Sequence, residues 1–306
     1  MEHLFEEDKF IVTAEIRPPK GVDYQTLMER IRMVKDYCDA INITDNVRAI
    51  PLMSSLACAH FVIEENAEPI MQMTSRDRNR IMFQSDLYGA YALGVRNVVF
   101  MRGDDPSLGT HPNAKGVYDL DTTQAISLAM HLEEGTDLAG DELEGSPSFF
   151  IGSTFNPFKE PQHEELAKIE RKRDAGAQFF QTQAVFDIDR FQDFMGNVQE
   201  LGIRTLAGII PLRNPEIAEF MNSNVEGICI PQEHIARLED AAAGLDEPHA
   251  SEAYEEEGLK IALELIEAVK RVQGVCGIHI MGVAWTESVP QIAQAAGLYP
   301  RPKRGK

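Results

Sequence analysis

The feature that most restricts the fold of this chain is a regular alternation of short apolar segments with amphipathic helical patterns. The apolar segments, interpreted as strands, cover residues 10–18, 38–46, 68–74, 96–103, 148–156, 177–185, 204–212 and 274–282. The helical patterns cover residues 23–37, 51–67, 82–94, 122–135, 164–176, 189–202, 215–224 and 258–274. Eight such units predict an α/β fold of the (β/α)8, or TIM barrel, type. A doubly wound open sheet is the alternative, but no G-x-G-x-x-G follows the first strand, as a dinucleotide-binding sheet requires.

The length of 306 residues suits a barrel that forms one domain, so we expect a single domain over residues 1–306. Two insertions fit between the barrel units, at residues 136–147 and at residues 233–257. The second is strongly acidic, with Arg237 as its one Lys or Arg. We expect it to be a solvated face or loop and not a binding device.

Composition excludes several classes of function. The net charge of −20 argues against a nucleic-acid partner, which needs a basic surface. No stretch approaches the ~18 uninterrupted apolar residues of a membrane span. The first ten residues, MEHLFEEDKF, lack the basic start and apolar middle of a signal peptide, so we expect a cytoplasmic protein. The cysteines, at positions 38, 58, 229 and 276, are too scattered for a disulfide framework or a zinc site, and we expect no metal.

In a barrel of this kind the carboxyl ends of the strands meet at one mouth, where the chemistry takes place. Polar residues at these ends are therefore the candidate functional residues. They are Glu15, Thr44, Asp45, Asn46, Gln72, Thr74, Arg102, Asp104, Asn156, Thr182, Gln183, Arg213, Asn214 and His279.

Three of these residues suit catalysis or ligand binding. Glu15 lies in an apolar strand, where its carboxyl should have a raised pKa that suits a general acid; the alternative is a structural ion pair with a basic neighbour. Asp104 follows Gly103, where backbone can approach a ligand closely, although Asp-Asp-Pro is also common turn chemistry. Gln183 can hydrogen-bond the edge of a heterocycle, or a group inside the barrel.

Other candidates have a plainer interpretation that we favour. The arginines of residues 75–81 and the basic run Arg171 to Arg173 could meet phosphates, but a solvated helix face is the commoner explanation. His279 could be a core histidine whose hydrogen bonds are satisfied. Taken singly, none of these residues identifies a reaction.

As an ordered set, the motifs resemble methylenetetrahydrofolate reductase, a flavin-dependent barrel family. The set consists of E-x-x-P-P at Glu15, the Arg-Gly-Asp loop at residues 102–104, K-x-D-A-G-A at residues 172–177, Thr-Gln at residues 182–183 and G-I-I-P at residues 208–211. The resemblance extends from residue 13 to the final helix. An unrelated barrel enzyme, such as a phosphate-binding lyase, is the remaining alternative.

The resemblance implies roles for individual residues. Glu15 corresponds to the family's general acid, Asp104 to an aspartate beside the flavin and the pterin, and Gln183 to a glutamine that contacts folate. With Thr44, these three form the implied folate set. The implied flavin contacts are Thr44, Gln72, Arg102, Gly103, Asp104, Tyr118, Gly152, Asn156, Glu165 and Lys172, the last as a phosphate ligand.

The implied activity is a ping-pong reduction of 5,10-methylenetetrahydrofolate to 5-methyltetrahydrofolate, a step of one-carbon metabolism and methionine biosynthesis. NAD(P)H would reduce FAD or FMN, and the flavin would pass a hydride to folate. The sequence departs from the family pattern at three places, and this leaves the identity of the electron donor open. Pro215 stands where the family places a stacking aromatic residue, Gln72 replaces a histidine, and the rim at residues 281–287 differs. Residues 72–94 look more like the form of anaerobic one-carbon metabolism. That form implies an iron–sulfur and zinc partner subunit, and the alternative function is then a barrel subunit of a larger redox complex without independent NAD(P)H activity. The oligomeric state, including a homo-oligomer, stays open.

Overall fold

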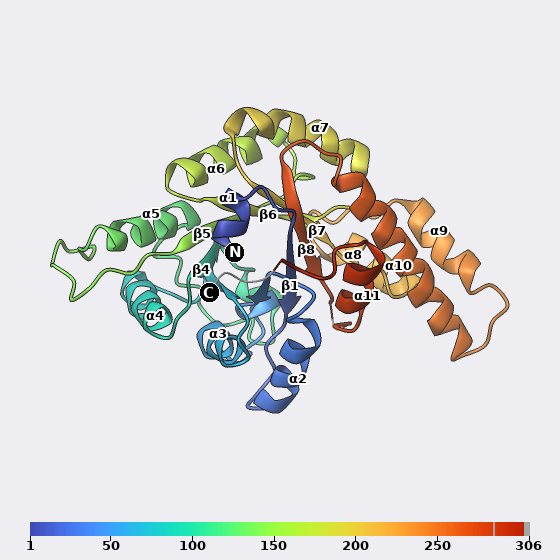
Figure 1. Cartoon of the computed structure of the whole chain (residues 1–306), viewed down its shortest axis with the longest axis horizontal. Helices are drawn as coiled ribbons and strands as arrows, with labels where there is room; N and C mark the ends of the chain where they lie inside the picture. The colour runs from blue at the N-terminus through green and yellow to red at the C-terminus, as the bar shows by residue number, and fades with distance from the viewer. Residues whose placement is uncertain (284, 303–306) are drawn as a thin grey trace.

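Apolar strands that are buried on both faces and separated by helices form a parallel sheet covered by helices, and here the sheet closes on itself. The computed structural model, which describes residues 1–283 and 285–302, contains a closed barrel in which β1 to β8 pair in chain order and β8 pairs with β1 (Figure 1). The strands are β1 (Ile11–Ile16), β2 (Ala40–Ile43), β3 (Pro69–Thr74), β4 (Asn97–Met101), β5 (Phe150–Phe155), β6 (Phe179–Ala184), β7 (Thr205–Ile209) and β8 (Val275–Met281). The predicted TIM barrel is confirmed, and each strand lies within its predicted segment.

Helices cover the outside of the barrel (Figure 1). They are α1 (Glu2–Glu6), α2 (Tyr24–Val34), α3 (Ser55–Glu64), α4 (Arg80–Ala92), α5 (Thr122–Glu133), α6 (Gln162–Asp174), α7 (Ile188–Val198), α8 (Pro215–Asn224), α9 (Gln232–Ala241), α10 (His249–Val269) and α11 (Ser288–Ala295). Three 3-10 helices are short: η1 (Val47–Ala49), η2 (Pro106–Leu108) and η3 (Gln199–Leu201). None of the described helices is long and apolar enough to cross a membrane.

The structure differs from the sequence prediction mainly in extra helices. Helices α1, α9 and α11 were not predicted, and α10 begins earlier than the predicted helix over 258–274. The acidic segment 233–257 forms α9 and the first part of α10, which project together from the barrel (Figure 1). Segment 136–147 connects α5 to β5 and contains an isolated antiparallel β-bridge between Thr136 and Glu142. Of the rim segment 281–287, Ala284 lies outside the described residues.

Side-chain caps fix the helix ends that adjoin the mouth. In six helices the residue before the first turn accepts a hydrogen bond from a backbone N–H of that turn, which satisfies one of its free donors. These capping residues are Asp23, Ser54, Asn79, Asp121, Asp187 and Asn214. Because each follows the carboxyl end of a strand, the caps hold the loops of the mouth in place.

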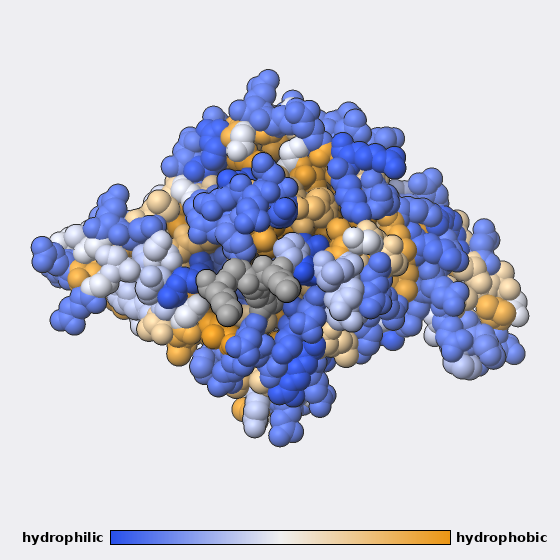
Figure 2. Space-filling model, in the orientation of Figure 1, coloured by the Kyte–Doolittle hydropathy of each residue, from blue (hydrophilic) through white to orange (hydrophobic). Residues whose placement is uncertain are grey.

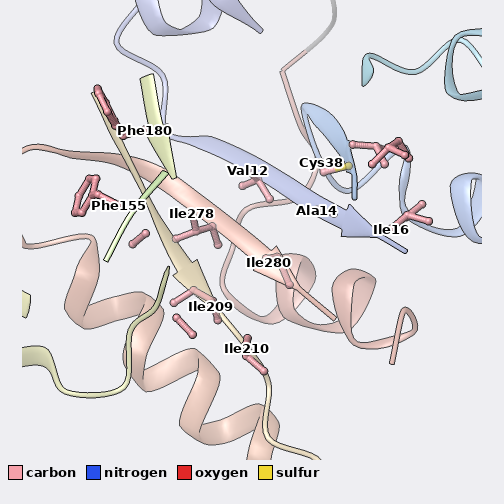
Figure 3. Close-up of a cluster of buried hydrophobic side chains, with 14 of the residues drawn as sticks. Val12, Ala14, Ile16, Cys38, Phe155, Phe180, Ile209, Ile210, Ile278 and Ile280 are labelled. Carbon is pink, nitrogen blue, oxygen red and sulfur yellow. The ribbon is translucent and has the colours of Figure 1, made fainter. Parts of the chain in front are cut away.

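The apolar core has two parts. The outer part lies between strands and helices and includes Val12, Ile209 and Ile278 (Figure 3). The inner part fills the amino-terminal end of the barrel, where Leu4 and Phe5 of α1 pack against strand residues. The face seen in Figure 2 is largely hydrophilic. The inner apolar layer closes one end of the barrel and leaves polar chemistry to the other.

Candidate active site

Glu15 lies inside the barrel, in the half nearer the carboxyl ends of the strands, beside a buried histidine. The side chains of β1 alternate, so Thr13 and Glu15 face the interior while Val12 and Ala14 pack outwards in the outer core. The pairing of β1 with β8 places His279 opposite Thr13. His279 Nε2 is 3.7 Å from Glu15 Oε2, and His279 Nδ1 is 2.9 Å from Thr13 Oγ1. These three side chains form a connected polar chain.

The chain can hold one proton between Glu15 and His279. The Thr13 hydroxyl lies 3.5 Å from the Ile278 carbonyl, to which it can donate. His279 Nδ1 then donates to Thr13 Oγ1, which leaves Nε2 facing the Glu15 carboxyl. A small movement would shorten the 3.7 Å separation to a hydrogen bond, along which a proton can pass between the two side chains. Among the described residues Glu15 pairs with no Lys or Arg, and the one form of the ion pair left open by the sequence is the contact with His279 when the imidazole is protonated.

An amide pair crosses the barrel interior close to Glu15. Asn42, the β2 residue opposite Glu15, donates to Gln181 Oε1 at 2.8 Å, and Gln181 Nε2 donates back to Asn42 Oδ1 at 3.1 Å. Both residues are buried, and each satisfies the other. The pair forms a rigid polar layer between β2 and β6. Sequence reasoning missed it because its two residues are 139 positions apart.

A buried ion-pair network holds the loops that follow β2 and β3. The Asp45 carboxylate accepts from the Thr74 backbone N–H at 2.8 Å, the Thr74 hydroxyl at 2.9 Å and Arg78 Nη1 at 2.5 Å. Arg78 also donates to Asp86 at 2.8 Å. Burial disfavours the charge of Arg78, but Asp45 and Asp86 outweigh it, so its pKa lies above the ordinary value.

The sequence left two interpretations of the arginines in segment 75–81, phosphate binding and a solvated helix face, and neither holds for all of them. Arg76 and Arg78 are buried, so they do not form a solvated helix face. Arg76 is bound by Asp77 and by the Asn46 carbonyl, at 2.6 and 3.0 Å. Arg80 is exposed and pairs with Asp119 at 2.9 Å. Each of these guanidinium groups already pairs with a carboxylate, so none of the three is free to bind phosphate.

The segment after β4 passes close over β3. Gly103 has a φ of +81°, and a Cβ there would lie 3.0 Å from the Thr74 Cβ, so glycine is required. Asp104 is exposed and its Oδ2 accepts the Arg48 backbone N–H at 2.8 Å. The Arg102 guanidinium lies 4.4 Å from the centre of the Tyr118 ring. Asp104 therefore anchors the loop after β2 and has further lone pairs for a ligand.

Buried polar atoms without partners gather on the β2 to β4 side of the barrel. Three of the seven such atoms among the described residues follow β2, β3 and β4: Thr44 Oγ1, Ser75 Oγ and Tyr118 OH, none of which hydrogen-bonds another described residue. The Tyr118 backbone N–H bonds the Ser75 carbonyl at 3.1 Å, which ties two of them together. Buried polar groups are nearly always satisfied in folded proteins. Such atoms suit the polar edge of a bound heterocycle.

The β5 side supplies an ammonium, from Lys172, and a carboxylate, from Glu165. Lys172 Nζ donates to the Thr154 carbonyl at 2.6 Å, so Lys172 does not lie on a solvated face. Although part of the residue is exposed, burial of the ammonium lowers its pKa to about 8, against the opposing charge of Glu165. Glu165 Oε1 accepts the Asn156 backbone N–H at 3.1 Å. These contacts fix the end of β5.

Gln183 and Gly152 have structural partners of their own. Gln183 Nε2 donates to the Glu226 carbonyl at 3.3 Å, and its Oε1 accepts the Ala184 backbone N–H at 3.0 Å. At Gly152, an added Cβ would lie 2.3 Å from the Phe179 ring. The ring therefore explains the glycine by core packing.

The mouth is almost neutral although the chain is strongly acidic. The eight loops that follow the carboxyl ends of the strands carry nine Lys and Arg against ten Asp and Glu, a net charge of −1, whereas the whole chain carries −20. Acidic residues concentrate elsewhere, including on α9 and α10. An anionic ligand therefore meets little local repulsion at the mouth.

Two hollows lie at the opposite end of the barrel. Their volumes are about 260 and about 520 Å³, and both are lined by His3 of α1 and by Glu68, which precedes β3. None of the strand-end candidates lines them. The described residues also contain no group of three His, Cys, Asp or Glu side chains that could hold a metal.

The structure brings most strand-end candidates to the mouth and adds others that the sequence did not single out. The additions are Thr13, Asn42, Gln181 and Ser75. Thr13 could have been found, because the two-residue period of a strand puts it on the same face as Glu15. Glu165 and Lys172 lie on α6, outside the strands, and reach the end of β5 from there.

Comparison with known proteins gives a family match over almost the entire chain. The family model described as methylenetetrahydrofolate reductase matches residues 1–297. A probable methylenetetrahydrofolate reductase (NADPH) of Caenorhabditis elegans is 24% identical over 314 residues, which cover 98% of this chain and 44% of the relative. A probable methylenetetrahydrofolate reductase (NADH) of Oryza sativa subsp. japonica is 25% identical over 329 residues, with 97% and 50% covered. The chain spans about half the length of these curated relatives.

Solved structures agree on the barrel. An uncharacterized protein from Clostridium thermocellum that binds two copies of 5-methyl-5,6,7,8-tetrahydrofolic acid has a TM-score of 0.65 at 15% identity, covering 97% of this chain and 99% of that one. A 2,3-dimethylmalate lyase of the PEP mutase/isocitrate lyase superfamily has a TM-score of 0.51 at 12% identity, covering 99% and 88%. At these identities the likeness shows the fold alone.

Proposed function

This chain belongs to the methylenetetrahydrofolate reductase family, and from that premise we propose that it interconverts 5,10-methylenetetrahydrofolate and 5-methyltetrahydrofolate by flavin-mediated hydride transfer. The observation that carries the proposal is the chain of Glu15, His279 and Thr13 inside the mouth. The barrel of the Clostridium thermocellum protein, which binds 5-methyl-5,6,7,8-tetrahydrofolic acid, supports folate as the ligand class.

Glu15 and His279 would supply the proton that the folate reaction needs. Reduction requires the five-membered ring of methylenetetrahydrofolate to open to an iminium ion, and its departing nitrogen must be protonated. In this proposal the one proton shared by Glu15 Oε2 and His279 Nε2, 3.7 Å apart, leaves Oε2 for that nitrogen, and solvent supplies the next proton after the product has left. Thr13 would hold the imidazole in orientation through Nδ1. In the reverse direction Glu15 accepts the proton.

The residues present suit a bound flavin at several of the implied positions, and one position is an exception. A bound flavin would supply the hydride acceptor and donor. The partnerless Thr44 Oγ1 and Tyr118 OH suit its polar groups, and Lys172 suits a phosphate. Gln72, Arg102, Gly103 and Asp104 lie on the same side, at β3 and after β4, whereas Asn156 and Glu165 hold the end of β5. At Gly152 the structure adds no such support, because contact with the Phe179 ring already explains the glycine.

A barrel subunit of a larger redox complex is the second candidate function, and one observation favours it. Pro215, the first residue of α8, is buried, so no aromatic ring stands there to stack on a nicotinamide. An iron–sulfur and zinc partner would then deliver the electrons in place of NAD(P)H. The isolated chain would be inactive with NADH and NADPH and active with an artificial donor.

The direct test is to purify the chain, record its absorbance spectrum and extract the flavin. We expect a yellow protein containing FAD or FMN, whose flavin is bleached by 5-methyltetrahydrofolate without oxygen. Titration with NADH and NADPH then separates the two candidate functions. A chain that binds neither FAD nor FMN on reconstitution would contradict both of them.

Flavin affinity should depend on pH through Lys172. A protonated ammonium attracts a phosphate, and the pKa of free Lys172 is about 8. The Kd of the flavin should therefore be constant below about pH 8 and rise by up to about tenfold per pH unit above it. Fluorescence quenching of added flavin measures this. Lys172→Arg should flatten the profile, because arginine stays charged, whereas Lys168→Arg, on the same helix, should keep the wild-type shape. A flat wild-type profile would exclude Lys172 from the flavin site.

A further inference from the structure

The loop after β2 has an unusual backbone. Within residues 46–50, here called the strap, Asn46, Arg48 and Ala49 have φ angles of +47°, +54° and +51°. Non-glycine residues in this left-handed region are strained, and such strain persists only where surrounding contacts enforce it. Clustered strain of this kind is commonest at ligand-binding and switch regions.

One side of the strap is firmly anchored to the β3 and β4 side of the mouth. The Asp104 carboxylate accepts the Arg48 N–H at 2.8 Å, and Arg76 Nη2 donates to the Asn46 carbonyl at 3.0 Å. Gly109 packs so closely that an added Cβ would lie 2.1 Å from the Ala49 carbonyl oxygen. The backbone of the strap is therefore held in place, and only its side chains are free to move.

On its other side the strap is held by a side-chain contact. The Arg48 guanidinium lies 5.5 Å from the centre of the Phe220 ring on α8. Phe220 is 49% exposed, so the contact lies at the surface and can open without disturbing the core. The strap follows β2 and α8 follows β7, so in the order β7, β8, β1, β2 the contact passes over the ends of β8 and β1. These are the strands that carry His279 and Glu15.

We propose that Arg48 and Phe220 form a clamp over Glu15, which parts to admit the folate ligand and closes again behind it. The pair would then be positioning residues. The identity of the ligand rests on the proposed function, whereas the clamp itself rests on the geometry. An exposed cation–π contact biases an equilibrium by a factor of about two to five, so the clamp opens readily and still favours the closed state.

The test is a double-mutant cycle read out by anaerobic stopped-flow spectroscopy of flavin reduction by 5-methyltetrahydrofolate. We expect Phe220→Leu and Arg48→Gln each to raise both the association rate and the dissociation rate of folate by about two- to fivefold with little change in Kd, because the contact is made in the free state and in the closed bound state alike. The double variant should be no worse than either single one, because both remove the same contact. Phe220→Trp, which keeps an aromatic face, should restore wild-type values. Val22→Ala, an 89% exposed apolar residue in the loop after β1, is the control and should change nothing.

A second measurement needs no ligand. Trypsin cleaves after arginine where the backbone opens locally, and the contact with Phe220 opposes opening of the strap, so Phe220→Leu should speed cleavage between Arg48 and Ala49 by a similar factor while Phe220→Trp should not. Additive effects in the cycle, or unchanged cleavage in Phe220→Leu, would overturn the clamp. A wild-type chain that ignores 5-methyltetrahydrofolate but shows faster cleavage in Phe220→Leu would instead contradict the proposed function and leave the clamp standing.

Discussion

Replacing Glu15 with glutamine is expected to lower the rate of folate-dependent flavin reduction by about 10²- to 10⁴-fold, the range for loss of a general acid or base. Glutamine matches glutamate in size and can still hydrogen-bond, but it cannot give up or accept a proton. The rate is measured by anaerobic stopped-flow with 5-methyltetrahydrofolate, whose oxidation requires Glu15 to accept the proton. Reduction of the same flavin by dithionite should be unaffected, since that half-reaction needs no group at the folate position.

Two comparisons make the Glu15 result specific. Glu29→Gln changes an exposed carboxylate on α2 in the same way and should leave both half-reactions at the wild-type rate. If Glu15→Gln lost flavin binding as well as folate chemistry, Glu15 would be a structural residue of the barrel. If it kept the folate rate within a few-fold of wild type, the proton would have to come from elsewhere.

The fold could be predicted because its information is local. Each strand segment contains a short, largely apolar stretch and is bounded by polar or glycine-containing turns, so eight repeats were visible one at a time. The helices that were missed are short or poorly patterned. Helix α11 has eight residues, and the many acids around α9 conceal its apolar face, which includes Ile235 and Leu238.

The site was less accessible because its contacts join distant parts of the chain. Thr13 and His279 are 266 residues apart and meet only because β8 closes the barrel against β1. A sequence shows that Glu15 lies in an apolar strand, but not which residue stands beside it. Likewise, nothing near Arg78 in the sequence indicates that Asp45, 33 residues earlier, will bind its guanidinium.

The family resemblance and the structure contribute different information about the same residues. The resemblance assigns Asp104 and Gly152 to the flavin by position in the sequence. The structure adds that Asp104 also holds the strap and that Gly152 is required by Phe179. A substitution at either position would therefore change the shape of the barrel or its mouth together with any ligand contact, and loss of activity alone would not identify the cause.

The largest effect on stability is expected from Arg78→Met. This change leaves the Asp45 carboxylate buried, with its side chain only 2% exposed, and removes the cation that compensates it. Breaking a buried ion pair by removing one partner costs about 3–5 kcal/mol, because the remaining charge has neither water nor a counter-ion. The free energy of unfolding, measured with urea, should fall by that amount. Since Asp45 also holds Thr74 at the end of β3, flavin affinity should weaken as well.

Arg80→Met is the matched control, since it removes the same side chain from the same segment. The Arg80 and Asp119 side chains are 55% and 30% exposed, so water screens the pair and its loss should have a much smaller effect on stability. A double variant, Asp45→Leu with Arg78→Met, should recover part of the loss, because two apolar groups replace an unpaired charge. If Arg78→Met and Arg80→Met destabilised the protein equally, burial would not be what distinguishes the two pairs. The ion-pair network could then not be what fixes the loops after β2 and β3, and the strap would depend on its contacts with Arg76, Asp104 and Gly109.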